Sequence, residues 1–249
     1  MANDICCTVV IYGPSGSGKS TLARELQKCG FDRIEQMTTR APRVYQTETP
    51  GVIRDETREG EYTFVSEKHF FKAIDMNALA ECTDFDKDPD GKVYYGSLLY
   101  RYKMPGLHVV TTSIEGAAQL AAIEDLQEHL IFVEEFASRL NLITRGISRK
   151  RDTLEEIIRR SLAEKKLYFS YRKYDIFPEQ TFRPDILFNG ADVCSENFEG
   201  IPRWLLEDDA LKERLVISFS PVEDAAVVIM AIVNGLEAGL YYMPDIWKD

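Results

Sequence analysis

The sequence predicts an α/β fold with a mostly parallel central sheet flanked by helices. An apolar, β-branched run at Cys6–Tyr12 has the composition of a buried strand, and it leads through a glycine-rich loop into a helix-forming segment at Ser20–Cys29. Further along, short apolar runs typical of buried strands alternate with stretches of helical periodicity. Strands separated by helices usually pair in parallel, so these two observations together favour a parallel sheet with helices on its faces.

The predicted elements follow one another along the whole chain. In the first helix, Leu22, Leu26 and Cys29 share one face, and Gly30 ends the segment. In a later helix, Thr153 has the side chain of an N-cap. The predicted strands are Cys6–Tyr12, Leu107–Thr112, Leu130–Val133, Asp185–Phe188 and Arg214–Ser220, and the predicted helices are Ser20–Cys29, Glu115–Gln127, Thr153–Phe169 and Val222–Leu240.

Two polar segments are expected to be loops. Val44–Glu61 carries the Pro50-Gly51 pair, which favours an irregular insertion. Thr83–Lys92 is acidic and rich in turn-forming residues, so we expect a second solvated loop there.

The composition excludes several classes of protein. Of the 249 residues, 45% are hydrophobic and 29% charged, which excludes disorder as the main state. There are 30 Lys and Arg against 41 Asp and Glu, a formal net charge of −11. An acidic surface repels nucleic-acid phosphates, so we expect no polynucleotide partner.

The expected location is the cytoplasm. No apolar run approaches the ~20 residues that span a bilayer, so we expect no membrane partner. The residues before Cys6 have no basic region typical of a secretory signal. The five cysteines are odd in number and include no C-x-x-C pair, which favours a reducing compartment over a disulfide framework or a zinc site.

A phosphate-binding loop follows the first predicted strand. The segment Gly13–Ser20 reads G-P-S-G-S-G-K-S and matches the pattern G-x-x-x-x-G-K-[ST]. Glycines let backbone N–H groups turn toward phosphates, Lys19 neutralises the β and γ oxygens, and the Ser20 hydroxyl can ligate Mg²⁺. A chance glycine turn is the alternative, but the strand before the loop and the helix after it favour binding of a nucleoside triphosphate with Mg²⁺.

The loop assigns several candidate residues but no acceptor. Lys19 is a candidate catalytic residue and Ser20 a candidate metal ligand. The candidate nucleotide-binding residues of the loop are Gly13, Ser15, Gly16, Ser17, Gly18, Lys19, Ser20 and Thr21. A GTPase, an ATPase motor and a small-molecule kinase all remain possible on this motif alone.

A second set of segments points to the acceptor. In Met37–Arg43, which reads M-T-T-R-A-P-R, the arginines at 40 and 43 flank a proline and can converge on one anion. The segments E-Y-T-F-V-S at 61–66, Glu81 and Y-Y-G-S at 94–97 follow in order. With these segments, the chain from about residue 5 to 200 resembles the guanylate kinase family of nucleoside monophosphate kinases.

The resemblance implies a domain organisation and cofactors. A P-loop kinase domain would occupy residues 1–200, with a nucleoside monophosphate (NMP)-binding subdomain at about 36–105 and a lid at about 138–153. Residues 201–249 would form a C-terminal extension, packed on the core or used in a homodimer. ATP and Mg²⁺ would be the cofactors, and a small nucleotide the substrate.

The resemblance also implies roles for residues on the acceptor side. Arg40, Arg43, Tyr62 and Tyr95 match the residues that hold the acceptor phosphate. Glu81 and Ser97 match those that read the guanine edge: a carboxylate can accept from both N1–H and the 2-amino group, a donor pair that adenine lacks. The alternatives are a solvated basic loop for the arginines, core packing for the tyrosines and a surface position for Glu81.

The lid would supply cations for phosphoryl transfer. The stretch Arg139–Arg151 is basic in an otherwise acidic chain, and charge develops on the transferred phosphoryl oxygens. We expect Arg145 and Arg160 to be catalytic, with Arg149 and Arg159 as the nearest alternatives. A charged helix face with a Glu156–Arg160 pair is the other possibility. Asn189 resembles a family residue near the adenine pocket.

The sequence departs from the family at three residues, in insertions at Val44–Glu61, Thr83–Lys92 and the lid, and in a C-terminal extension past Gly200. Thr111 and Ser113 stand where the family has paired aspartates that assist the Mg²⁺ shell and guanine reading, and Gln36 replaces a phosphate-binding serine. We therefore expect ATP- and Mg²⁺-dependent phosphorylation of a nucleoside monophosphate, GMP or dGMP first. The alternatives are a kinase of a modified nucleotide or phosphorylated sugar, and a non-catalytic module that binds protein ligands.

Overall fold

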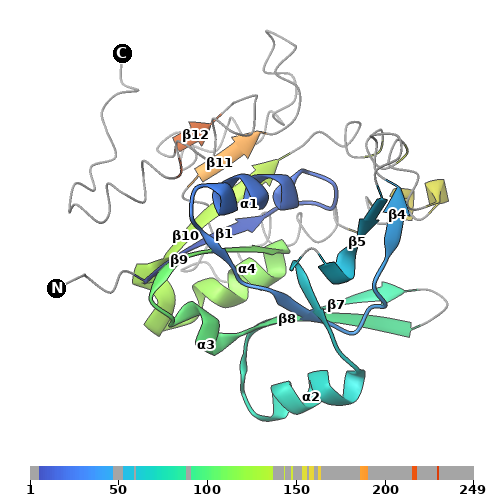
Figure 1. Cartoon of the computed structure of the whole chain (residues 1–249), viewed down its shortest axis with the longest axis horizontal. Coiled ribbons are helices and arrows are strands. Elements are labelled where there is room, and N and C mark those ends of the chain that lie inside the picture. Colours follow the sequence, from blue (N-terminus) through green and yellow to red (C-terminus); the bar gives the residue numbers. More distant parts are fainter. Residues whose placement is uncertain are drawn as a thin grey trace, which may run out of the picture.

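The structure is a computed structural model of the whole chain (Figure 1). It describes residues 6–46, 53–58, 60–87 and 91–136, and the positions 143, 147, 153–155, 157–159, 162–163, 186–189, 215–217 and 229.

The central sheet is parallel, as the sequence predicts. Six strands lie in the order β12-β11-β10-β1-β9-β2, and every neighbouring pair is parallel. Each predicted strand is present or overlaps an observed one. The strands are β1 (Cys6–Tyr12), β2 (Asp32–Arg33), β9 (Gly106–Thr112), β10 (Leu130–Phe136), β11 (Ile186–Asn189) and β12 (Leu215–Ile217).

Helices cover both faces of this sheet. Helix α1 (Lys19–Lys28) follows β1 toward β2 on one side, whereas α4 (Ile114–Ala121) leads from β9 to β10 on the other side of β1. Right-handed crossovers in opposite directions place the two helices on opposite faces, as Figure 1 shows. Val10 and Tyr12 of β1 pack with Ala117 of α4 in one buried cluster.

One predicted helix is two elements. The sequence predicts a continuous helix over Glu115–Gln127, but α4 ends at Ala121 and a 3₁₀ helix, η2, occupies Glu124–His129. Ile123 between them has extended backbone angles, with φ −85° and ψ 100°. This break lets Leu126 turn back into the core, where it is fully buried. Burial of Leu126 therefore outweighs the helical periodicity of the segment.

A smaller sheet carries the acceptor-side segments. Its order is β6-β3-β8-β7, and helix α2 follows β6 with Ser66 accepting a hydrogen bond from His69 N at its N-cap. In Figure 1 this sheet and α2 lie below the parallel sheet. The elements are β3 (Gln36–Thr38), β6 (Tyr62–Phe64), α2 (Glu67–Asp75), β7 (Leu79–Lys87), β8 (Gly91–Leu98) and α3 (Leu99–Tyr102).

Both segments predicted to be loops contain regular structure. Within Val44–Glu61, β4 (Val44–Gln46) pairs antiparallel with β5 (Ile53–Asp55), and the 3₁₀ helix η1 (Glu56–Arg58) follows. Thr83–Lys92 lies in the β7–β8 hairpin, where Thr83 and Val93 are buried. Asp84 of this acidic segment is exposed beside the buried Thr83, and composition alone does not reveal such an alternation.

Several predictions fall outside or at the edge of the described residues. The lid at 138–153 and the extension at 201–249 lie almost wholly outside them, as do most of the predicted helices Thr153–Phe169 and Val222–Leu240. Ile157 N donates to Thr153 O at 3.0 Å, and Ile229 is helical and buried, which agrees with those two helices at these positions. In the described part of the chain, no helix is both long and apolar enough to cross a membrane.

Candidate functional site

The P-loop joins β1 to α1 at the carboxyl edge of the parallel sheet. Lys19 Nζ donates to the carbonyl oxygens of Gly13 at 2.7 Å and Pro14 at 2.8 Å, so its side chain curls over the loop. The N-cap of α1 is Gly18, which has no side chain to cap the helix. No side-chain cap therefore competes with an anion at the N-terminus of α1.

The glycines of the loop are required by their neighbour β10. A Cβ on Gly13 would lie 2.2 Å from the backbone oxygen of Glu135. A Cβ on Gly18, whose φ is +127°, would lie 2.3 Å from the Glu135 carboxylate. A side chain at position 13 would push the loop and the backbone of β10 apart, and one at position 18 would also be strained by the positive φ.

The metal-ligand candidate Ser20 contacts an acceptor-side residue. Ser20 Oγ donates to Glu61 Oε1 at 2.6 Å. The guanidinium of Arg33 lies 3.1 Å from the same oxygen and donates through Nη2 to Thr111 Oγ1 at 3.0 Å. Glu61 had no predicted role. The hydroxyl and carboxylate oxygens here are the ligand types that Mg²⁺ prefers, so this donor set fits the ion that the motif implies.

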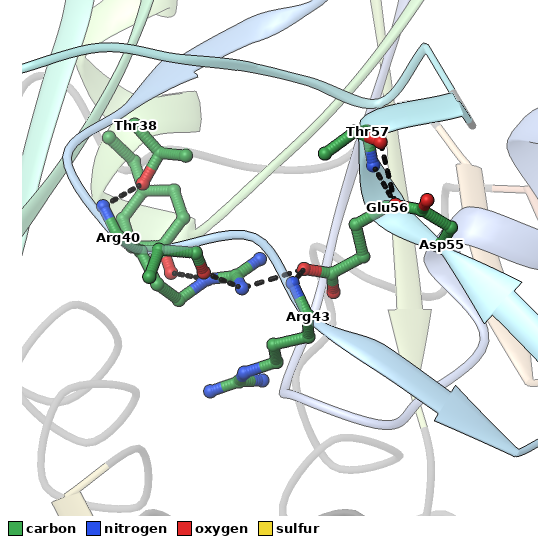
Figure 2. A network of polar contacts seen from close by, with 8 residues as sticks. Thr38, Arg40, Arg43, Asp55, Glu56 and Thr57 are labelled. Carbon is green, nitrogen blue, oxygen red and sulfur yellow. Dashed lines mark hydrogen bonds and ion pairs between the residues drawn. The ribbon is translucent and has the colours of Figure 1, made fainter.

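The acceptor-phosphate candidates meet around Arg40. Its Nε donates to Tyr95 Oη at 3.0 Å and its Nη1 to Glu56 Oε2 at 2.7 Å. The guanidinium carbon lies 5.3 Å from the ring centroid of Tyr62, which is within cation–π range. Figure 2 shows Arg40 and Glu56 facing one another. The structure thus brings Arg40, Tyr62 and Tyr95 together.

Glu56 is the residue that sequence reasoning missed at this position. It is buried, and the same Oε2 accepts from the backbone N of Arg43 at 2.9 Å. Figure 2 shows the side chain of Arg43 extending away from Glu56. A buried arginine needs a nearby carboxylate, which is the signal that could have found it. Several acids of the Val44–Glu61 segment compete for that role, and only the fold selects Glu56.

The charges of this cluster shift its pKa values. Burial alone lowers the pKa of Arg40, but its hydrogen bond to Glu56 and the contact with Tyr95 raise it overall, so the guanidinium stays charged. Burial raises the pKa of Tyr62, and the negative charge of Glu61 adds to the effect. Tyr62 therefore keeps its proton and can donate it in a hydrogen bond to a phosphate oxygen.

The base-reading candidates meet at the carboxylate of Glu81. Glu81 is 2% exposed, and its Oε1 accepts from Gln36 Nε2 at 3.0 Å and from Ser97 Oγ at 2.8 Å. Its Oε2 lies 3.4 Å from Thr112 Oγ1. Burial raises the pKa of Glu81, and these three hydrogen bonds oppose that rise. The side chain of Gln36, which replaces the family's phosphate-binding serine, is thus bonded to the candidate base-reading carboxylate.

Thr111 and Ser113, which stand in place of the family's two aspartates, make structural contacts. Ser113 is the N-cap of α4, and its Oγ accepts from Gly116 N at 3.1 Å. Thr111 Oγ1 accepts from Arg33. Gly116 itself has no room for a side chain, because a Cβ would lie 2.2 Å from Thr112 Oγ1 and 2.7 Å from Glu81 Oε2. Neither Thr111 nor Ser113 supplies a carboxylate to the site.

Three predicted site residues have no described side chain. Arg145 and Arg160 lie outside the described residues, and Asn189 is described only as the last residue of β11. Asn189 pairs in register with Phe136, at the same carboxyl edge of the sheet as the P-loop. The roles of these three residues remain predictions.

Comparison with known proteins relates the chain to one protein family and to a solved structure. The model of a protein family described as Guanylate kinase matches residues 6–180, which include the P-loop and every acceptor-side residue above. Among solved structures, the chain is similar to the guanylate kinase of Anaplasma phagocytophilum, with 16% sequence identity and a TM-score of 0.49. That alignment covers 96% of this chain and 88% of the other.

Proposed function

Because this chain belongs to the guanylate kinase family, we propose that it transfers the γ-phosphoryl group of ATP to the phosphate of a nucleoside monophosphate. One observation carries the proposal. Glu61 contacts Ser20 of the P-loop, and the next residue, Tyr62, supplies the ring beneath Arg40. Glu61 and Tyr62 are consecutive at the start of β6, which supports candidate donor and acceptor phosphate sites close enough for in-line transfer.

The donor half would bind ATP through the loop from Gly13 to Thr21. Backbone N–H groups would cradle the phosphates, and Lys19 would leave its carbonyl partners to neutralise the β and γ oxygens. Ser20 would hold Mg²⁺, which would neutralise negative charge on the phosphates of ATP. The family generally uses ATP and Mg²⁺, which supports this assignment.

The acceptor half would hold the monophosphate between two arginines and two tyrosines. Arg40 is fixed by Glu56 and Tyr95, which supports a preorganised cation. Arg43, Tyr62 and Tyr95 would complete the anion site. No covalent intermediate is needed, because positioning and electrostatic stabilisation carry this reaction. Arg145 and Arg160 would enter from the lid to stabilise the transferring group, and Asn189 would lie near the adenine of ATP.

The proposed acceptor is GMP or dGMP. The Glu81 carboxylate with Ser97 beside it would accept from N1–H and the 2-amino group of guanine. The absence of acids at Thr111 and Ser113 favours a second candidate of the same reaction type, a modified nucleotide or a phosphorylated sugar. A non-catalytic binding module is a third candidate, and the complete P-loop disfavours it.

We also propose the organisation of the whole chain. Residues 1–200 would form the kinase domain, with the acceptor subdomain at about 36–105 and the lid at about 138–153. Residues 201–249 would pack on the core or join two copies in a homodimer. The protein would act in the cytoplasm on small nucleotides. Light scattering of the full chain would separate a monomer from a homodimer.

The experiment for this proposal is an acceptor screen. All ribo- and deoxyribonucleoside monophosphates are offered with Mg·ATP, and release of ADP is measured with a coupled assay. Turnover with GMP and dGMP is expected. Turnover only with a modified nucleotide or phosphorylated sugar favours the second candidate. Tight Mg·ATP binding without any turnover favours the binding module.

A further inference from the structure

Glu61 occupies a place that the proposed function leaves without a role. Its carboxylate touches the P-loop serine, yet it belongs to the acceptor subdomain, where its backbone oxygen accepts from Gln36 N at 3.2 Å. The side chain of Glu61 is 13% exposed, so the contact is largely shielded from water. A carboxylate at this position influences the binding of any ligand that Ser20 holds.

The hydrogen bond fixes the orientation of the Ser20 hydroxyl. A serine hydroxyl has one proton and two acceptor lone pairs. Glu61 Oε1 lies 2.6 Å from Ser20 Oγ and accepts its hydrogen bond, so the hydroxyl proton points toward Glu61. The lone pairs then point away from Glu61, in the state that a metal ligand needs. A carboxylate that accepts a hydrogen bond from a metal ligand also makes that ligand more basic.

Arg33 explains why this carboxylate comes from Glu61 and not from β9. The side chain of Arg33 is 5% exposed, and a buried cation needs a carboxylate nearby. Thr111, at the end of β9, gives Arg33 only a hydroxyl oxygen. Glu61 Oε1 thus serves both Arg33 and Ser20, and one acid balances the cation and orients the hydroxyl.

We propose that Glu61 is the positioning residue for the metal ion at Ser20, in place of the acid that Thr111 and Ser113 do not supply. The inference rests on the proposed function, since it assumes that Ser20 binds the Mg²⁺ of a nucleotide. It also links the two halves of the site. Because Tyr62 follows Glu61 directly, an ordered metal site aligns the strand that carries the acceptor-phosphate residues.

The test measures how much Mg²⁺ strengthens ADP binding, by calorimetry on the full chain with Mg²⁺ and with EDTA. Glu61→Gln keeps the shape but removes the charge. It is expected to reduce the metal-dependent gain in affinity about 10- to 100-fold, the usual effect of losing a residue behind a metal ligand. Affinity for ADP in EDTA is expected to stay within about twofold. Binding of Mn²⁺ by electron paramagnetic resonance should weaken in parallel.

The matched control is Glu35→Gln. Glu35 is exposed and accepts from Thr63 Oγ1 at 2.6 Å, so it is a hydrogen-bonded acid two residues from Arg33 that does not reach Ser20. This variant is expected to keep the full metal-dependent gain. Thr111→Asp in the Glu61→Gln background is expected to restore part of the metal-dependent gain. The new side chain places a carboxylate at position 111, which contacts Arg33.

Three outcomes would overturn the inference. One is a metal-dependent gain unchanged in Glu61→Gln, and another is an equal loss of ADP binding with and without Mg²⁺, which indicates a structural role alone. If Glu61→Gln does not fold, Glu61→Asp is measured in the same way. An unchanged metal-dependent gain in affinity for Glu61→Asp is the third outcome. Acceptor turnover does not enter these measurements. If the wild-type chain phosphorylates an acceptor but Glu61→Gln keeps the full metal-dependent gain, only this inference is refuted. If Mg²⁺ strengthens ADP binding but no acceptor is phosphorylated, only the proposed reaction is refuted.

Discussion

The donor and acceptor halves of the candidate site are built in different ways. The donor half is one continuous loop, residues 13–21, and Lys19 is held by the carbonyls of that same loop. The acceptor half collects side chains from β3, the segment after β3, η1, β6, β7 and β8, separated by up to 61 positions between Gln36 and Ser97. Arg40, Glu56 and Glu81 of this half are buried. Arg40 donates to Glu56, and Glu81 accepts from Gln36 and Ser97.

The difference predicts how each half responds to substitution. A loop held by its own backbone can lose a side chain without loss of fold, so changes there should act on chemistry. A network of buried charges loses stability when one member is removed, because the partner is left without compensation. Changes in the acceptor half should therefore alter stability and binding together.

The largest effect is expected at Glu56. Glu56→Ala leaves the buried guanidinium of Arg40 without its carboxylate, and breaking such a pair costs roughly 3–5 kcal/mol of unfolding free energy. Urea unfolding followed by circular dichroism measures it. Asp55→Ala, which removes a partly exposed neighbour bonded to Thr57, is the control and should cost much less. Equal effects of the two variants would contradict a buried network.

A comparable effect on rate alone is expected at Lys19. Lys19→Met removes the cation from the loop and should lower turnover about 10²- to 10³-fold, the usual effect of losing one group that stabilises developing charge. The melting temperature should hardly change, because Lys19 donates to carbonyls of its own loop. Steady-state rates and thermal melts separate the two. A large fall in the melting temperature of Lys19→Met would contradict the proposed difference between the donor and acceptor halves.

A moderate effect is expected at Gly116. Gly116→Ala places a Cβ 2.2 Å from Thr112 Oγ1 and 2.7 Å from Glu81 Oε2, and overpacking of this kind costs roughly 1–3 kcal/mol. Thr112→Ala removes one of the two clashing atoms. The double variant should therefore be destabilised by less than the sum of the single variants, and strict additivity would show that the clash is relieved elsewhere.

The smallest effect concerns the pH dependence of stability. The pKa of Glu81 is raised by burial, so above its ordinary value of about 4.3 the folded chain holds a proton that the unfolded chain releases. Its contribution to stability is full below that value and is lost as pH rises toward the folded pKa, with a slope of at most about 1.4 kcal/mol per pH unit. Glu81→Gln should remove this slope. An identical pH profile in the two proteins would contradict it.

The sequence predicts the donor half well and the acceptor half in part. The strand, loop and helix from Cys6 to Lys28 depend on local signals, and they are observed where predicted. The contact of Gln36 with Glu81 depends on strand pairing, which brings β3 beside β8 and β8 beside β7. The contact of Arg40 with Glu56 depends on η1 lying against the segment after β3. No spacing along the chain encodes these contacts.

The misassigned elements have a similar origin. The acidic β7–β8 hairpin has a polar composition because one side faces water, and its buried side is visible only once Thr83 and Val93 are placed in the sheet. The break at Ile123 arises because Leu126 completes the core beneath β10. In both cases tertiary burial overrides a local pattern.

The central claim is that both halves form one phosphoryl-transfer site, and transfer of label from [γ-³²P]ATP to GMP tests it most directly. The wild-type chain should form labelled GDP. Arg40→Met should abolish that product while Mg²⁺-dependent binding of ADP stays within about twofold, because Arg40 belongs to the acceptor half alone. Labelled GDP formed at the wild-type rate by Arg40→Met, or label released to water whether or not GMP is present, would contradict the account.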